Sequence, residues 1–188
     1  KREDDRNLIQ EFNSSGYTYV ETAETMKSAK GDMLLGMFAP GGLTHAESEP
    51  TLAEMTSKAL DMLRVNDNGF FLMVEGSQID WGGHGNDAAY VMREVQSFDE
   101  AIGVVLDFAV ENGETLVVIT ADHETGGMTL QSGINSDSEM EIAWSTGSHT
   151  GIPVPLMAYG PQSLQFSGWH ENSEVGVMVA LILGMEIK

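Results

Sequence analysis

Three glycine-rich stretches of the sequence combine carboxylates with imidazoles at short spacing. They read IDWGGH, TADHETGG and STGSHTG, and their acidic and imidazole side chains include Asp80, His84, Asp122, His123 and His149. Two carboxylates and three imidazoles form a ligand set that is suited to zinc. Glu75, five residues before Asp80, offers a harder oxygen ligand of the kind that magnesium prefers. The residue types therefore predict a metal site built from separate segments.

A single pair such as Asp80 and His84 is more often an ordinary polar pair at the end of a strand. Three such stretches, each after a predicted strand or in an adjacent loop, are poorly explained in that way. In open α/β sheets, functional sites form beyond the carboxyl ends of the strands. Periodicity alone identifies neither the metal nor whether two metals share the site.

Apolar patterns predict the elements that would position these stretches. Strands are expected at 17–22, 33–39, 70–75, 115–122 and 153–160, the last three of them buried. Helices are expected at 51–64, 87–111 and 173–183, and a polar loop at 131–148. Thr51 and Glu54 fit a capping box at the start of one helix, and Gly113 would end another. We therefore expect an α/β fold of three layers, with a mainly parallel sheet covered by helices on both faces.

Composition excludes several classes of function. The chain has 188 residues, which suits one domain, and no run of apolar residues is long enough to cross a membrane. Acidic residues number 29 against 9 basic ones, for a net charge of -20, so nucleic acid is not an expected partner. Those carboxylates either form a solvated surface or are partly gathered around cations. The chain has no cysteine, which excludes a thiolate zinc site.

Taken together, the motifs resemble the C-terminal half of bacterial alkaline phosphatases. VEGSQIDWGGHGND, TLVVITADHETGG and GSHTG, the last followed by a strand ending in AYGP, occur in that family's order and separation. The flanking EPTLAEMTSKALDML and the closing LGMEIK agree as well. The likeness runs over essentially the whole chain and is weakest between 131 and 145. It implies an alkaline phosphatase-like fold that is present as a partial domain.

The resemblance implies a role for each of the five ligands. Asp80, His84 and His149 would bind a first zinc, which activates the leaving-group oxygen and later the attacking water. Asp122 and His123 would bind a second zinc beside a serine nucleophile. Two metals about 4 Å apart can stabilise both the entering and the leaving oxygen of an in-line phosphoryl transfer.

Two further residues belong to the expected site. Glu75 would reach a neighbouring magnesium site. Trp81 stands where many members of the family carry Lys or His, whose charge can contact phosphate directly or through water. An indole supplies no charge, although its N–H can donate a hydrogen bond. Trp81 either packs beside the site or donates there, so phosphate affinity and the metal at the third site stay open.

The resemblance implies that no catalytic nucleophile lies in this chain. In the family, the serine nucleophile, a phosphate-binding arginine and a bridging aspartate lie in the N-terminal half, and no Asp-Ser-Ala motif occurs here. Ser77 is close to the site in sequence but has no activating base beside it. His45 and His170 match no motif and are expected to be ordinary loop residues. The opening KREDDRNLIQEF suggests a helix already in progress. We therefore expect residues 1–188 to be the C-terminal portion of a single catalytic domain.

The expected activity of the parent protein is metal-dependent hydrolysis of small phosphate monoesters, with this chain inactive alone. By analogy, the parent would be a homodimer and would be periplasmic or secreted. One alternative is another metallophosphoesterase of the same superfamily, such as a phosphodiesterase, sulfatase or metal-dependent mutase. A second alternative is a non-catalytic module that keeps the ligands for metal binding alone.

Overall fold

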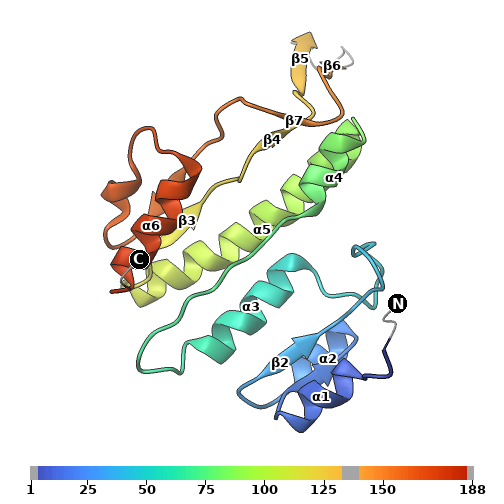
Figure 1. Cartoon of the computed structure of the whole chain (residues 1–188), viewed down its shortest axis with the longest axis vertical. Coiled ribbons are helices and arrows are strands. Elements are labelled where there is room, and N and C mark those ends of the chain that lie inside the picture. Colours follow the sequence, from blue (N-terminus) through green and yellow to red (C-terminus); the bar gives the residue numbers. More distant parts are fainter. Residues whose placement is uncertain (1–3, 133–139, 186–188) are drawn as a thin grey trace. The chain divides into compact units, whose positions relative to one another are not determined.

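The computed structural model describes residues 4–132 and 140–185, and the chain divides into two compact units, Lys1–Glu75 and Gly76–Lys188. Both units combine helices with strands (Figure 1), which confirms the predicted α/β class. None of the helices in the described ranges is long and apolar enough to cross a membrane. Each unit is described below by itself.

The first unit is a small α/β arrangement around one parallel strand pair. Its elements are α1 (Leu8–Ser14), β1 (Thr18–Val20), α2 (Ala23–Ser28), β2 (Leu34–Gly36) and α3 (Leu52–Leu63). β1 and β2 pair in parallel, with Tyr19 opposite Leu35. Val20 of β1, Met26 of α2 and Leu60 of α3 are buried and supply the apolar interior of this unit.

Reciprocal capping fixes the start of α3, as the sequence predicts. The Glu54 amide donates to the Thr51 hydroxyl at 3.1 Å, and the Thr51 amide donates to the Glu54 carboxylate at 3.0 Å. The Glu54 carboxylate also pairs with Lys27 of α2 at 2.5 Å. The Lys27 ammonium and then the Thr51 amide hold the pKa of the Glu54 carboxyl below its usual range.

The N-terminal helix begins later than expected. Asn7 caps α1, because its side-chain oxygen accepts from the Gln10 amide at 3.1 Å, and the helix starts at Leu8. Residues 4–6 precede that cap, and none of residues 4–7 is helical. The prediction of a helix already in progress is therefore wrong for these residues.

The prediction of a buried strand at 70–75 is also wrong. This segment has no strand assignment and belongs to none of the ladders formed by the described strands. The exposed fractions are 63% for Phe71 and 74% for Met73. An apolar run indicates that a segment can be buried, but a strand also needs a neighbouring backbone to pair with.

The second unit is organised along one long helix. Its helices are α4 (Gln78–His84), α5 (Ala88–Asn112), the 3-10 turn η1 (Ser163–Phe166) and α6 (Asn172–Ile182). Its strands are β3 (Val117–Ile119), β4 (Glu124–Thr125), β5 (Thr129–Ser132), β6 (Glu141–Ala143), β7 (His149–Thr150) and β8 (Met157–Tyr159). Gly113 caps the end of α5, as the sequence predicts, and its φ of 72° is the left-handed conformation typical of such a cap.

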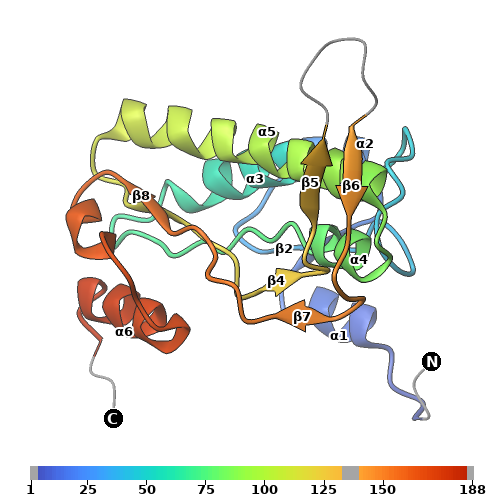
Figure 2. The same cartoon turned by 90° about the horizontal axis from the view of Figure 1, so that it is seen from above.

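The strands of the second unit pair in antiparallel ladders, β3 with β8, β4 with β7 and β5 with β6. Figure 2 shows the last two of these pairs. Among the described residues, only the ladder of β1 and β2 is parallel. The α/β class holds, but the mainly parallel direction expected of the sheet is not what these ladders show. An apolar pattern reports burial on both faces of a strand and carries no information about the direction of its partner.

The described parts of 131–148 are more regular than the expected loop. β5 and β6 pair in an antiparallel ladder, with Thr129 opposite Ala143 and a register shift between Leu130 and Ser132. The part of the prediction that concerns 133–139 lies outside the described residues. The expected closing helix at 173–183 is confirmed as α6.

Candidate metal centre

The short ladder of β4 and β7 brings two of the candidate histidines onto one face. Thr125 of β4 stands directly opposite His149 of β7. Residues two apart on an extended chain point to the same side, so His123 shares that side with Thr125. The other side of the ladder carries Glu124 and Thr150, whose hydroxyl donates to the Glu124 carboxylate. A single strand pair thus directs His123, Thr125 and His149 the same way.

The remaining ligands of the predicted first site come from α4. Asp80 and His84 are four residues apart and therefore lie on one face of this helix. Gly82 and Gly83 are helical here, although glycine has a low helix propensity. The helical arrangement positions the Asp80 carboxylate and the His84 imidazole more definitely than a loop would.

Gly82 and Gly83 serve close packing instead of a turn. A Cβ at Gly83 would lie 2.8 Å from the carbonyl oxygen of Thr125, so any side chain there would push α4 away from β4. A Cβ at Gly82 would lie 2.9 Å from a methyl group of Val91 in α5. Both glycines are buried. Their lack of a side chain is what allows α4 to approach its two neighbours.

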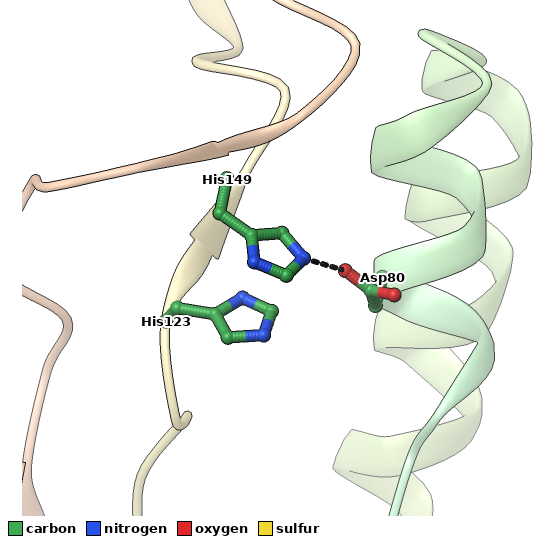
Figure 3. Close-up of side chains that lie close together, drawn as sticks. All are labelled: Asp80, His123 and His149. Atoms are coloured by element: carbon green, nitrogen blue, oxygen red, sulfur yellow. Dashed lines mark ion pairs between the residues drawn. The ribbon is translucent and has the colours of Figure 1, made fainter.

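Asp80, His84 and His149, which we call the His84 triple, meet through three of their atoms. The Asp80 Oδ1 atom lies 3.5 Å from His84 Nε2 and 3.6 Å from His149 Nε2. The two Nε2 atoms are 3.2 Å apart. Figure 3 shows the His149 imidazole directed at the Asp80 carboxylate across the gap between ladder and helix. The structure thus brings together the three residues to which the family resemblance gives a first zinc.

The hydrogen bond behind His84 determines which ring nitrogen faces the centre. His84 Nδ1 lies 2.9 Å from the carbonyl oxygen of Gly147. A carbonyl can only accept, so Nδ1 is the protonated nitrogen, and Nε2 of the neutral ring carries a lone pair toward Asp80 and His149. Three electron-pair donors at this spacing need a proton or a cation among them.

Asn86 joins the same two segments a few residues away. Its side-chain amide donates to the carbonyl of Gly83 at 3.0 Å and to the carbonyl of Thr146 at 2.8 Å. Its φ of 49° lies in the left-handed region, which asparagine tolerates better than most residues. The end of α4 is thereby tied to the loop that leads into His149.

Asp122 and His123, which we call the His123 pair, adjoin the triple. The Asp122 Oδ2 and His123 Nε2 atoms are 3.3 Å apart. The His123 and His149 rings are stacked, with centroids 3.6 Å apart and planes 21° from parallel (Figure 3). Ligand atoms of Asp80, His123 and His149 also lie within 4.8 Å of one another. Asp80 and His149 therefore border both candidate positions.

The distances in the His84 triple fit a tetrahedral metal. Ligand atoms about 2.0 Å from a tetrahedral zinc stand roughly 3.3 Å from each other. The three separations in the triple run from 3.2 to 3.6 Å. One carboxylate and two imidazoles is also a common donor set of zinc sites that keep an open position. The donor atoms of this chain thus suit the metal that the sequence predicts.

Thr125 is the site residue that sequence reasoning missed. Its hydroxyl lies 2.5 Å from Asp80 Oδ1 and 3.2 Å from His123 Nδ1. Its place two residues after His123 was the available signal, because that spacing puts both side chains on one face of a strand. Threonine is so common in strands that its presence there did not suggest a role in the site.

The other residues singled out from the sequence lie elsewhere. Glu75 is exposed and ends the first unit, so its expected magnesium role stays a prediction. Trp81 follows Asp80 on α4 and is 48% exposed. Ser77 precedes α4 and makes no side-chain cap to it. His170 contacts the carbonyl of Ser167 at 3.1 Å, and His45 lies in a loop with a φ of 62°.

Comparison with known proteins identifies the family. The family model described as alkaline phosphatase matches residues 1–139. Alkaline phosphatase 3 of Bacillus subtilis is 33% identical in an alignment that covers 98% of this chain and 56% of that protein. The chain belongs to the alkaline phosphatase family. It spans little more than half the length of that relative.

Solved alkaline phosphatases share the fold. The enzyme from the Antarctic bacterium TAB5 is 33% identical with a TM-score of 0.83, and the match covers 99% of this chain and 57% of that one. A mutant of the TAB5 enzyme has been solved with Mg bound. The cold-active alkaline phosphatase of a psychrophilic Shewanella species has a TM-score of 0.86 at 27% identity, over 94% of this chain and 62% of that one.

Proposed function

We propose that this chain is the metal-binding portion of an alkaline phosphatase that hydrolyses small phosphate monoesters. The observation that carries the proposal is the mutual spacing of the Asp80, His84 and His149 ligand atoms, 3.2 to 3.6 Å, in a chain of this family. The sequence-based assignment of these three residues to one metal agrees with that spacing.

We assign the His84 triple to a first zinc, and Asp122 and His123 to a second. Stacking of the His123 and His149 rings supports neighbouring positions. Glu75 is proposed as a ligand to magnesium at a third position. The TAB5 mutant with Mg bound supports magnesium as a metal that a related protein accepts.

When bound, such divalent metals supply Lewis-acid chemistry to phosphate oxygens and to water. The chain's own residues prepare for it. Gly147 holds the His84 ring with its Nε2 lone pair facing the centre, and Thr125 donates to the Asp80 carboxylate. Trp81, beside Asp80 on an exposed part of α4, is proposed to border the substrate and to offer its indole N–H there.

The serine nucleophile is proposed to lie outside these 188 residues, within the same catalytic domain. The match to only 56% of the Bacillus subtilis relative supports a division of the catalytic groups between this chain and further sequence. A homodimeric parent and a periplasmic or secreted location are proposed on family analogy.

Activity of the full-length protein tests this function and its nearest rivals together. We expect hydrolysis of p-nitrophenyl phosphate that chelation by EDTA abolishes and zinc restores, with much slower turnover of bis(p-nitrophenyl) phosphate and p-nitrophenyl sulfate. Faster turnover of the diester or the sulfate would instead indicate a phosphodiesterase or a sulfatase.

The 188-residue chain alone is expected to bind zinc without hydrolysing p-nitrophenyl phosphate at an enzyme-like rate. A full-length protein that binds zinc and hydrolyses none of these substrates would favour a non-catalytic metal-binding module. Zinc-dependent turnover by the chain alone, surviving in Ser77→Ala, would contradict the placement of the nucleophile.

A further inference from the structure

We propose that the Thr125 hydroxyl is a positioning group that couples the two metal positions through one hydrogen-bond chain. This inference rests on the function proposed above, because it assumes that Asp80 and His123 bind metals. Thr125 contacts both of these ligands but is not itself one of the expected ligands.

The contact between Thr125 and Asp80 fixes the donor-to-acceptor direction of the hydrogen bonds. A hydroxyl has one hydrogen to donate and lone pairs to accept. The 2.5 Å separation from Asp80 Oδ1 is that of a charge-assisted hydrogen bond to a carboxylate, so the Thr125 hydrogen points at Asp80. The same oxygen can then only accept from His123.

The contact to His123 therefore fixes a tautomer. His123 Nδ1, 3.2 Å from the Thr125 oxygen, must carry the proton and donate it. The other ring nitrogen, Nε2, is left with a lone pair beside Asp122 Oδ2, 3.3 Å away. Thr125 thus does for His123 what the Gly147 carbonyl does for His84, and its partner on the other side is the carboxylate of the His84 triple.

Two features hold the hydroxyl in this place. Thr125 pairs with His149 in the ladder of β4 and β7, so its backbone is fixed by the strand that carries a ligand. Gly83 allows α4 to approach the Thr125 backbone closely, which brings Asp80 within reach of the hydroxyl. The side chain is partly buried, which protects these hydrogen bonds from competition by water.

Three variants test the coupling by zinc titration of the 188-residue chain. Thr125→Val keeps the β-branched shape and removes the hydroxyl, and we expect it to weaken zinc binding by about 10-fold to 100-fold, the usual effect of losing a partner behind a ligand. Thr125→Ser keeps the hydroxyl, and its zinc affinity should lie within about 3-fold of that of the unsubstituted 188-residue chain. Thr129→Val removes an exposed hydroxyl of β5 and should leave zinc affinity unchanged.

Thermal unfolding of the metal-free variants separates positioning from a merely structural role. If Thr125→Val unfolds at a lower temperature but binds zinc with the affinity of the unsubstituted 188-residue chain, the hydroxyl only stabilises the fold, and the proposal is overturned. If Thr125→Ser binds zinc as weakly as Thr125→Val, keeping the hydroxyl does not preserve binding, which also overturns the proposal. Failure of the unsubstituted 188-residue chain to bind zinc would instead contradict the proposed function.

Discussion

The two halves of the candidate centre differ in how firmly the chain positions their ligands. The His84 triple takes one residue from a ladder and two from a helix, and its carboxylate, Asp80, is 36% exposed. The His123 pair consists of two consecutive residues, and its carboxylate, Asp122, is 79% exposed. The Asp80 carboxylate accepts a hydrogen bond from Thr125, whereas at Asp122 the Asn172 side-chain amide donates to the backbone carbonyl.

This difference shows that two neighbouring groups of candidate ligands can differ in how many ligand atoms the fold brings together. Three ligand atoms converge in the triple, with the His84 ring oriented from behind by Gly147. The His123 pair supplies two ligand atoms. The backbone of Asp122 is held by Asn172, but its carboxylate faces solvent. Affinity follows the number of ligands that are already in place before the metal arrives.

Removing the charge of Asp80 should have the largest effect, because this carboxylate borders both halves. Asp80→Asn keeps the size and an acceptor for Thr125 but loses the negative charge. We expect zinc affinity to fall by more than about 100-fold, beyond the loss caused by removing a partner behind a ligand. Calorimetric zinc titration measures it. Asp99→Asn, at an exposed carboxylate of α5, is the control and should bind zinc with the affinity of the unsubstituted chain. Equal affinity of Asp80→Asn and the control would show that Asp80 is not a ligand.

A smaller effect is expected from separating the helix and the ladder. Gly83→Ala places a methyl group where 2.8 Å remains to the Thr125 carbonyl oxygen, and the resulting displacement should destabilise the chain by about 1–3 kcal/mol. Zinc affinity should drop as well, because Asp80 moves away from His149. Denaturant unfolding and zinc titration check both expectations.

Gly85→Ala is the matched control for that substitution. A Cβ at Gly85 would lie 3.4 Å from the Trp81 carbonyl oxygen, which is an ordinary contact, so this variant should retain stability and zinc binding. If Gly83→Ala behaves like Gly85→Ala, the close approach of α4 to β4 does not hold the triple together.

Sequence reasoning anticipated which side chains lie close together better than it anticipated the secondary structure that carries them. Residue types alone predicted a metal site built from separate segments, and the resemblance to alkaline phosphatases then grouped Asp80 with His84 and His149. The helix at Gln78–His84 was missed, since glycines 82 and 83 disfavour a helix by propensity and tertiary packing outweighs that preference here.

Pairing was the least accessible property of the fold. The runs at 115–122 and 153–160 do contain strands, β3 and β8, but their antiparallel direction depends on how the intervening chain returns. The run at 70–75 has the composition of a strand without a partner among the described residues. Thr125 shows the same limit within the site, because its role depends on a residue 45 positions away in the chain.

The central claim is that the His84 triple is by itself a zinc site in this chain, and zinc calorimetry of two alanine variants tests it most directly. The variants are His84→Ala, which removes an imidazole from the His84 triple, and His123→Ala, which removes one from the His123 pair. We predict one tight site in the parent chain, retained within about 10-fold in His123→Ala and weakened by more than about 100-fold in His84→Ala. Equal losses in the two variants, or a greater loss in His123→Ala, would contradict the account.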